Sequence, residues 1–86
     1  MIVSAQVSIY PLGTDDLAPA IDLAIAVLQK YNIDYEVGPM STLISGEMEP
    51  VQAALNAMFS QVAAQYAVVM QYTLSNTCPI AKENGS

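Results

Sequence analysis

The chain has 86 residues and a net charge of −6, from eight acidic side chains against two lysines, with no arginine and no histidine. A field of this sign repels phosphate backbones and anionic headgroups, so it disfavours binding to nucleic acids and to membrane surfaces. The absence of histidine excludes Ser–His triads and Cys–His pairs, and a metal site would need carboxylates alone, so none is expected.

The length predicts one small domain whose core is marginal without added support. Cys78 is the single cysteine, so an intrachain disulfide cannot provide that support. Hydrophobic residues make up 53% of the chain, which points to self-association as the extra source of stability. No apolar run approaches the ~18 residues of a membrane span, and no basic leader precedes the first strand, so we expect a cytoplasmic protein.

The first predicted element is a half-buried strand over residues 2–10, because apolar and polar side chains alternate there. One face would carry Val3, Ala5, Val7 and Ile9. The other face would carry Ser4, Gln6, Ser8 and Tyr10. Pro11 lacks a backbone donor, and we expect it to end the strand.

A helix is predicted over residues 17–31, with Asp16 as its N-cap and Pro19 in its first turn. Asn32 would follow as the C′ residue with positive φ. Helical spacing gives a core face of Leu17, Ile21, Ala24, Ile25 and Leu28.

The middle of the chain predicts a hairpin, with one strand at Asp34–Val37, a Gly38-Pro39 turn and a second strand over Ser41–Ser45. A second helix is expected over about residues 50–64, with a core face of Val51, Ala54, Leu55, Met58, Phe59 and Val62. The last strand, residues 66–74, would direct Val68, Met70, Tyr72 and Leu74 toward the helices and Val69, Gln71 and Thr73 away from them. We assign residues 1–76 to the domain and residues 77–86 to a partly disordered tail.

The order β-α-β-β-α-β predicts an α+β fold of the ferredoxin-like type, in which both helices cover one face of a four-stranded antiparallel sheet. The other face has no cover within the chain. It could meet water, a ligand or a second subunit, and we expect dimerisation through this face or through an exposed edge strand.

Few residues have side chains that suit a catalytic or ligand-binding site. Asp15 and Asp16 suit the start of a helix better than a catalytic pair, and Cys78 is predicted to be an inert thiol. Glu47, at the end of a strand, could accept hydrogen bonds from an amino group or offset a positive charge on a ligand.

Three segments together resemble the thiamine-binding protein family, whose small ferredoxin-like members were formerly grouped as a domain of unknown function. They are Val7-Ser8-Ile9-Tyr10-Pro11-Leu12-Gly13-Thr14, Tyr35-Glu36-Val37-Gly38-Pro39-Met40-Ser41-Thr42 and Ile44-Ser45-Gly46-Glu47. The chain departs from the family after the last strand, where Ser75-Asn76-Thr77-Cys78-Pro79 stands in place of basic residues.

The resemblance implies non-catalytic binding of thiamine or its hydroxymethylpyrimidine moiety, with no further cofactor, by a homodimer or homotetramer. A tyrosine could stack on a ligand ring, hydroxyls could bond the pyrimidine edge, and Glu47 could accept its amino group. The candidate ligand-binding residues are Ser8, Tyr10, Tyr35, Gly38, Pro39, Met40, Ser41, Thr42 and Glu47.

Two other functions stay open on sequence grounds. The uncovered sheet face, with Ser4, Gln6, Val69 and Gln71, could make the chain a regulatory domain that binds another protein. An enzyme that uses Glu47 or Asp15 as its acid–base group is disfavoured, because neither histidine nor arginine is present.

Overall fold

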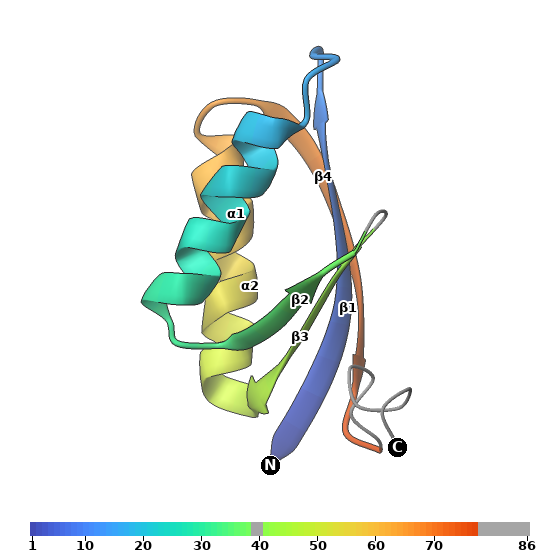
Figure 1. Cartoon of the computed structure of the whole chain (residues 1–86), viewed down its shortest axis with the longest axis vertical. Helices are drawn as coiled ribbons and strands as arrows, with labels where there is room; N and C mark the ends of the chain where they lie inside the picture. Colours follow the sequence, from blue (N-terminus) through green and yellow to red (C-terminus); the bar gives the residue numbers. More distant parts are fainter. Residues whose placement is uncertain (39–40, 78–86) are drawn as a thin grey trace.

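The computed structural model describes residues 1–38 and 41–77. Its four strands form a single antiparallel sheet in the order β2-β3-β1-β4, and both helices pack on one face (Figure 1). The predicted ferredoxin-like fold is therefore confirmed. The elements are β1 (Ile2–Leu12), α1 (Ala18–Lys30), β2 (Asp34–Val37), β3 (Thr42–Glu47), α2 (Met48–Ala63) and β4 (Ala67–Ser75).

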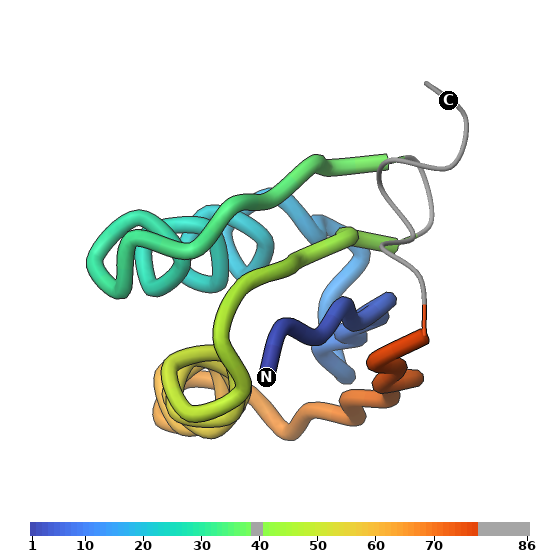
Figure 2. Tube along the Cα trace, turned by 90° about the horizontal axis from the view of Figure 1, so that it is seen from below, coloured from blue at the N-terminus to red at the C-terminus, as the bar shows by residue number. Residues whose placement is uncertain are grey.

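The core lies between the sheet and the helices, which form two separate layers when the molecule is seen end-on (Figure 2). Alternation along β1 directs Val3, Ala5 and Val7 into this layer, as the sequence predicts. The helices close it with buried residues that include Ala24, Leu28, Val51, Ala54, Leu55, Met58 and Val62.

The predicted end of α1 is confirmed. Asn32 has a φ of 59°, and its N–H donates to the carbonyl of Gln29 over 3.2 Å. The N–H of Ile33 donates to the carbonyl of Leu28 over 3.1 Å. These two bonds form a Schellman motif, which satisfies carbonyls that the end of the helix would otherwise leave without donors.

The predicted helix starts need correction. Leu17, not Asp16, is the N-cap of α1, and Asp16 Oδ1 instead accepts a hydrogen bond of 3.2 Å from the N–H of Ala18. Helix α2 begins at Met48, two residues earlier than expected, because Glu47 ends β3 and also serves as the N-cap. The N–H of Met48 donates to the carbonyl of Met1 over 2.9 Å, which ties this junction to the start of β1.

Strand β1 runs past Pro11 to Leu12, so the prediction that Pro11 ends it is wrong. Pro11 pairs with Val68 of β4, whereas the pairing of β1 with β3 stops at Val7 and Thr42. Proline is tolerated in a strand where its missing N–H has no ladder partner to serve. In the described ladder, Ile9–Leu12 therefore pair with β4 alone, and this overhang of β1 positions the candidate site.

Four side chains that were predicted to face the core are exposed, and one of them is Leu74 of β4, at 36%. Leu17, at the start of α1, is 45% exposed, and Phe59 of α2 is 41% exposed. Tyr72 lies opposite Val7 on the helix side of the sheet, but it remains 43% exposed because β4 is an edge strand. Neither described helix is long and apolar enough to cross a membrane.

Candidate ligand-binding pocket

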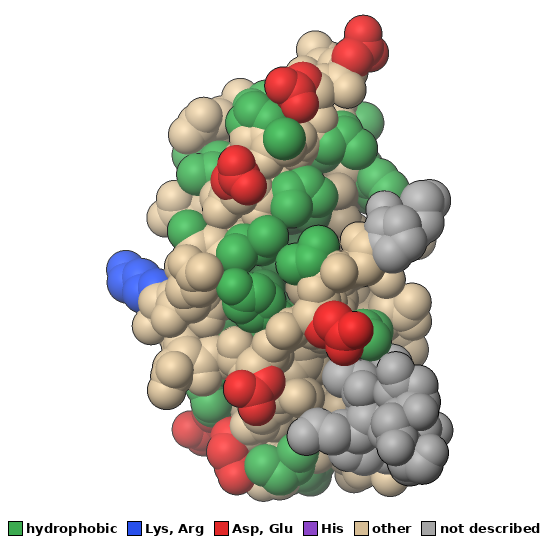
Figure 3. All heavy atoms as spheres, in the orientation of Figure 1, with side chains coloured by type: hydrophobic (Ala, Val, Ile, Leu, Met, Phe, Trp, Pro, Cys, Tyr) green, Lys and Arg blue, Asp and Glu red, His purple; other side chains and the backbone are tan. Residues whose placement is uncertain are grey.

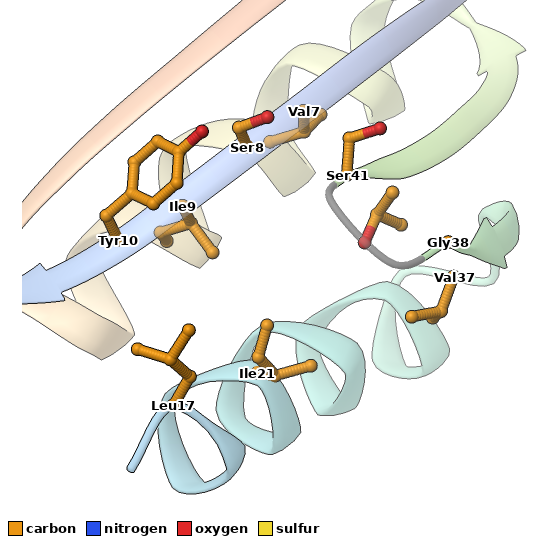
Figure 4. Close-up of a pocket in the computed structure, with 10 residues that line it drawn as sticks. Val7, Ser8, Ile9, Tyr10, Leu17, Ile21, Val37, Gly38 and Ser41 are labelled. Carbon is orange, nitrogen blue, oxygen red and sulfur yellow. The ribbon is translucent and has the colours of Figure 1, made fainter. Parts of the chain in front are cut away.

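A pocket lies between the first half of α1 and the overhang of β1, and the β2–β3 hairpin borders it at one end (Figure 4). It contains about 510 Å³ of empty space, counting the part open to solvent. The lining residues are Val7, Ser8, Ile9, Tyr10, Leu17, Ile21, Val37, Gly38, Ser41 and Thr42.

The walls of the pocket are mainly apolar. Leu17 and Ile21 point from α1 toward Ile9 of β1, and Val37 stands at the hairpin end (Figure 4). Tyr10 and the hydroxyl groups of the lining add polar atoms at the rim. An apolar space with a few polar groups at its edge is the usual composition of a small-molecule site.

The hairpin end of the pocket depends on a close backbone approach. The N–H of Gly38 donates to the carbonyl of Ser41 over 2.8 Å, and a Cβ at position 38 would lie 3.1 Å from that oxygen. Glycine fits here because it has no Cβ. Gln6 Nε2 donates to Ser41 Oγ over 3.3 Å, so the same serine is also held from β1.

The surroundings of the pocket are acidic. Apolar side chains gather in the middle of the face shown in Figure 3, and acidic side chains stand around them. Asp16, Asp22 and Glu36 are direct sequence neighbours of lining residues. In the described part of the chain the only lysine is Lys30, in the last turn of α1. This distribution of charge favours a cationic ligand over an anionic one.

The structure brings together five of the nine candidate residues from the sequence, namely Ser8, Tyr10, Gly38, Ser41 and Thr42. Pro39 and Met40 lie outside the described residues. The predicted tail, apart from Thr77, lies outside them too, including Cys78.

Tyr35 and Glu47 lie elsewhere in the chain. The hydroxyl of Tyr35 accepts a hydrogen bond of 3.1 Å from Gln29 Nε2, and its ring packs against the core. Glu47 is five residues along β3 from Thr42, a separation of roughly 16 Å. Its Oε1 lies 3.0 Å from the terminal ammonium of Met1. Within one chain, neither residue is part of the pocket.

Sequence reasoning missed the apolar part of the site. The spacing of apolar side chains assigns four of these residues to the core, namely Val7, Ile9, Leu17 and Ile21. It identifies Val37 only as a strand residue. One signal was available in the sequence, because the predicted first strand, residues 2–10, is longer than the predicted strand Ser41–Ser45, which the structure places beside it. Where one strand extends beyond its neighbour, the helix that packs over that region has no second strand beneath it.

The remaining titratable residues do not form a second centre. Among residues 1–38 and 41–77, no three Asp, Glu, Cys or His side chains are grouped closely enough to hold a metal ion. Asp16 serves the start of α1 through its contact with the N–H of Ala18. Among the described residues that line the pocket, Tyr10 alone has a titratable side chain.

The model of the family "Thiamine-binding protein" matches residues 5–75, which is most of the chain. The chain therefore belongs to the thiamine-binding protein family. It is 34% identical over 64 residues to a UPF0045 protein of Methanothermobacter thermautotrophicus, an alignment that covers 66% of this chain and 65% of that protein.

Two solved structures share the fold over almost the whole chain. A hypothetical protein from Methanocaldococcus jannaschii matches with a TM-score of 0.87 and 26% identity, covering 98% of this chain and 93% of the other. A proposed thiamine biosynthesis or salvage protein from Thermotoga maritima matches with a TM-score of 0.85 and 21% identity, covering 99% and 97%.

Proposed function

We propose that this protein binds thiamine, or the hydroxymethylpyrimidine moiety of thiamine, in the pocket between α1 and the overhang of β1. It does so without catalysis, as a cytoplasmic homo-oligomer. The observation that carries the proposal is an apolar pocket with a hydroxyl rim and acidic surroundings, in a chain of the thiamine-binding protein family.

The pocket suits the cationic part of thiamine. The thiazolium ring has a permanent positive charge, and the acidic residues near the pocket lower the free energy of a cation there. Tyr10 offers an aromatic ring at the rim, which attracts a cation that lies over its face. Leu17, Ile21 and Val37 provide apolar contact for the rings.

The pocket also offers partners for an aminopyrimidine edge, which carries both donors and acceptors. The hydroxyl of Thr42 can donate or accept at the hairpin end of the lining. Beyond Ser8, the described part of β1 has a ladder partner only in β4, so backbone groups on the pocket side can bond a ligand.

A binding role agrees better with these side chains than a catalytic one. The residues that are described in the lining include no carboxylate, lysine or cysteine to act as base or nucleophile at neutral pH. The chain has no arginine or histidine to stabilise a developing negative charge.

Isothermal titration calorimetry with thiamine and with hydroxymethylpyrimidine tests the proposal. We expect saturable binding of at least one ligand. Ile21→Trp should abolish it, because a large ring on the inner wall fills the pocket. Ala26→Trp is the matched control, since Ala26 is an exposed residue of the same helix, and it should bind like the wild type.

Two results would contradict the proposal. In the first, neither ligand binds to the wild type at millimolar concentration. In the second, the two tryptophan variants bind the ligand equally well. Circular dichroism of each variant verifies that the fold is retained.

A further inference from the structure

The first turn of α1 borders one end of the pocket. Leu17, the N-cap of this helix, lines the pocket at the same end as Tyr10 (Figure 4). The first turn of a helix has N–H groups without partners inside the helix, and its dipole attracts negative charge. Phosphate groups commonly bind at such a turn. The donors of this turn therefore decide whether a phosphate can bind at this end of the pocket.

The donors of the first turn of α1 are occupied, absent or buried. The N–H of Ala18 donates to Asp16 Oδ1 over 3.2 Å, so a carboxylate stands where a phosphate oxygen would bind. Pro19 has no N–H. Ala20 is fully buried, so its N–H is out of reach of a ligand in the pocket. These three residues therefore offer no N–H group to an anion.

The charges around the pocket also oppose a phosphate. A phosphate monoester carries a charge of about −1.5 to −2 at pH 7. Asp22 and Glu36 are direct sequence neighbours of lining residues, and both are exposed. Lys30 comes after Ile21 on α1 by roughly 14 Å along the helix axis. Among the described residues, no lysine next to the pocket therefore offsets the charge of a phosphate.

We infer that Asp16 and Pro19 determine the specificity of the pocket, which binds a ligand with a free alcohol and excludes the phosphate ester of that ligand. The inference rests on the proposed function, because thiamine and hydroxymethylpyrimidine both carry such an alcohol. It deepens that function, since it separates the free compounds from their phosphorylated forms. Asp16 acts by occupying the donor of Ala18 and by its negative charge, whereas Pro19 acts by removing a donor.

Calorimetric titration with thiamine and with thiamine monophosphate tests this specificity. We expect the wild type to bind thiamine more tightly than the monophosphate, by about tenfold or more. Asp16→Asn removes the charge and keeps an oxygen that can accept from Ala18. It should reduce the preference for thiamine by about threefold or more, mainly because the monophosphate binds more tightly.

Glu49→Gln is the matched control for Asp16→Asn. It makes the same change in net charge, but at the first turn of α2, which lies at the other end of the molecule from the first turn of α1 (Figure 1). A charge at that distance is largely screened by salt. The control should therefore keep the preference within about twofold of the wild type.

Inorganic phosphate gives a second measurement, which needs no thiamine. In the double variant Asp16→Gly with Pro19→Ala, the N–H of Ala18 loses its acceptor and position 19 gains an N–H. Both positions are exposed, so a phosphate can reach them. We expect millimolar phosphate to shift the amide NMR signals of residues 18–20 in the double variant and to leave those of the wild type unchanged.

The control for the phosphate titration is Asp15→Gly with Pro19→Ala. It removes one negative charge from the same loop but keeps the bond from Ala18 to Asp16. It should therefore bind phosphate more weakly than the double variant that lacks Asp16. Circular dichroism verifies that each variant keeps the fold.

Three results would overturn the inference. They are a wild type that binds thiamine and its monophosphate equally well, a preference that Asp16→Asn and Glu49→Gln change by the same factor, and a double variant that responds to phosphate no more than the wild type. A wild type that binds neither thiamine nor hydroxymethylpyrimidine contradicts the proposed function instead. In that case the phosphate titration still tests the roles of Asp16 and Pro19.

Discussion

At the scale of single residues, Tyr10 is the clearest candidate for a direct ligand contact. It lines the pocket, it is the one aromatic side chain in the described part of the lining, and it is 40% exposed. A side chain with this exposure adds little to the core, so its replacement can change binding without unfolding the protein.

We predict that Tyr10→Ala weakens thiamine binding by roughly 2- to 30-fold, the range that corresponds to a cation–π contact of about 0.5–2 kcal/mol. Tyr10→Phe keeps the ring and should bind within about twofold of the wild type. Calorimetric titration of both variants measures the effect. An alanine variant with unchanged affinity would show that the ring does not contact the cation.

Some of the candidate ligand-binding residues that lie close together in the sequence lie far apart in the folded chain. Gly38 and Thr42 border the same pocket. Glu47 follows closely in sequence, but strand geometry carries it to the other end of β3, where it contacts the ammonium of Met1. An extended strand separates residues that a motif places near one another.

At the scale of elements, local signals predicted most of what the structure shows. The periodicity of apolar side chains predicted the order of strands and helices, and Asn32 predicted the end of α1. The starts of both helices were displaced by one or two residues, because the sequence offers several acidic or proline residues at each start. Element boundaries depend on hydrogen bonds that no single residue determines.

The end of α1 gives a stability prediction. Asn32 has a φ of 59°, a conformation that costs most residues with a Cβ about 1 kcal/mol more than it costs glycine or asparagine. Asn32→Ala should therefore lower the free energy of unfolding by about 1 kcal/mol. Asn32→Gly should leave it within a few tenths of 1 kcal/mol. Urea unfolding measures both, and an alanine variant as stable as the wild type would refute the cap assignment.

The pocket itself was not predictable from local signals. Leu17 and Ile21 have the helical spacing of core residues, and spacing is the same whether the opposite surface is filled or hollow. The hollow arises because β3 stops opposite Val7 while β1 continues to Leu12. That difference in strand pairing is a property of the sheet, and neither strand encodes it alone.

At the scale of the whole molecule, the two long edges of the sheet differ in character. The β2 edge carries Asp34 and Glu36, and β2 is one strand of the hairpin that borders the pocket. The β4 edge carries no charge. Of the two edge strands, only the one nearer the pocket carries acidic side chains, and there they favour a cationic ligand over an anionic one.

The composition indicated an acidic and strongly apolar chain, and the structure shows where the acidic and apolar side chains lie. The net charge of −6 favoured a cationic ligand, and the high hydrophobic content favoured self-association. Which side of the sheet each property belongs to depends on the strand order β2-β3-β1-β4. Strand order comes from long-range pairing, and composition carries no information about it.

The most direct test of the central claim is a titration of isotope-labelled protein with thiamine, followed residue by residue through its amide NMR signals. We predict that the largest shifts occur at the pocket, above all at Ile9, Tyr10, Ile21, Gly38 and Thr42. An absence of shifts at millimolar thiamine, or shifts centred on Gln6, Gln71 and Thr73 of the uncovered sheet face, would contradict the account.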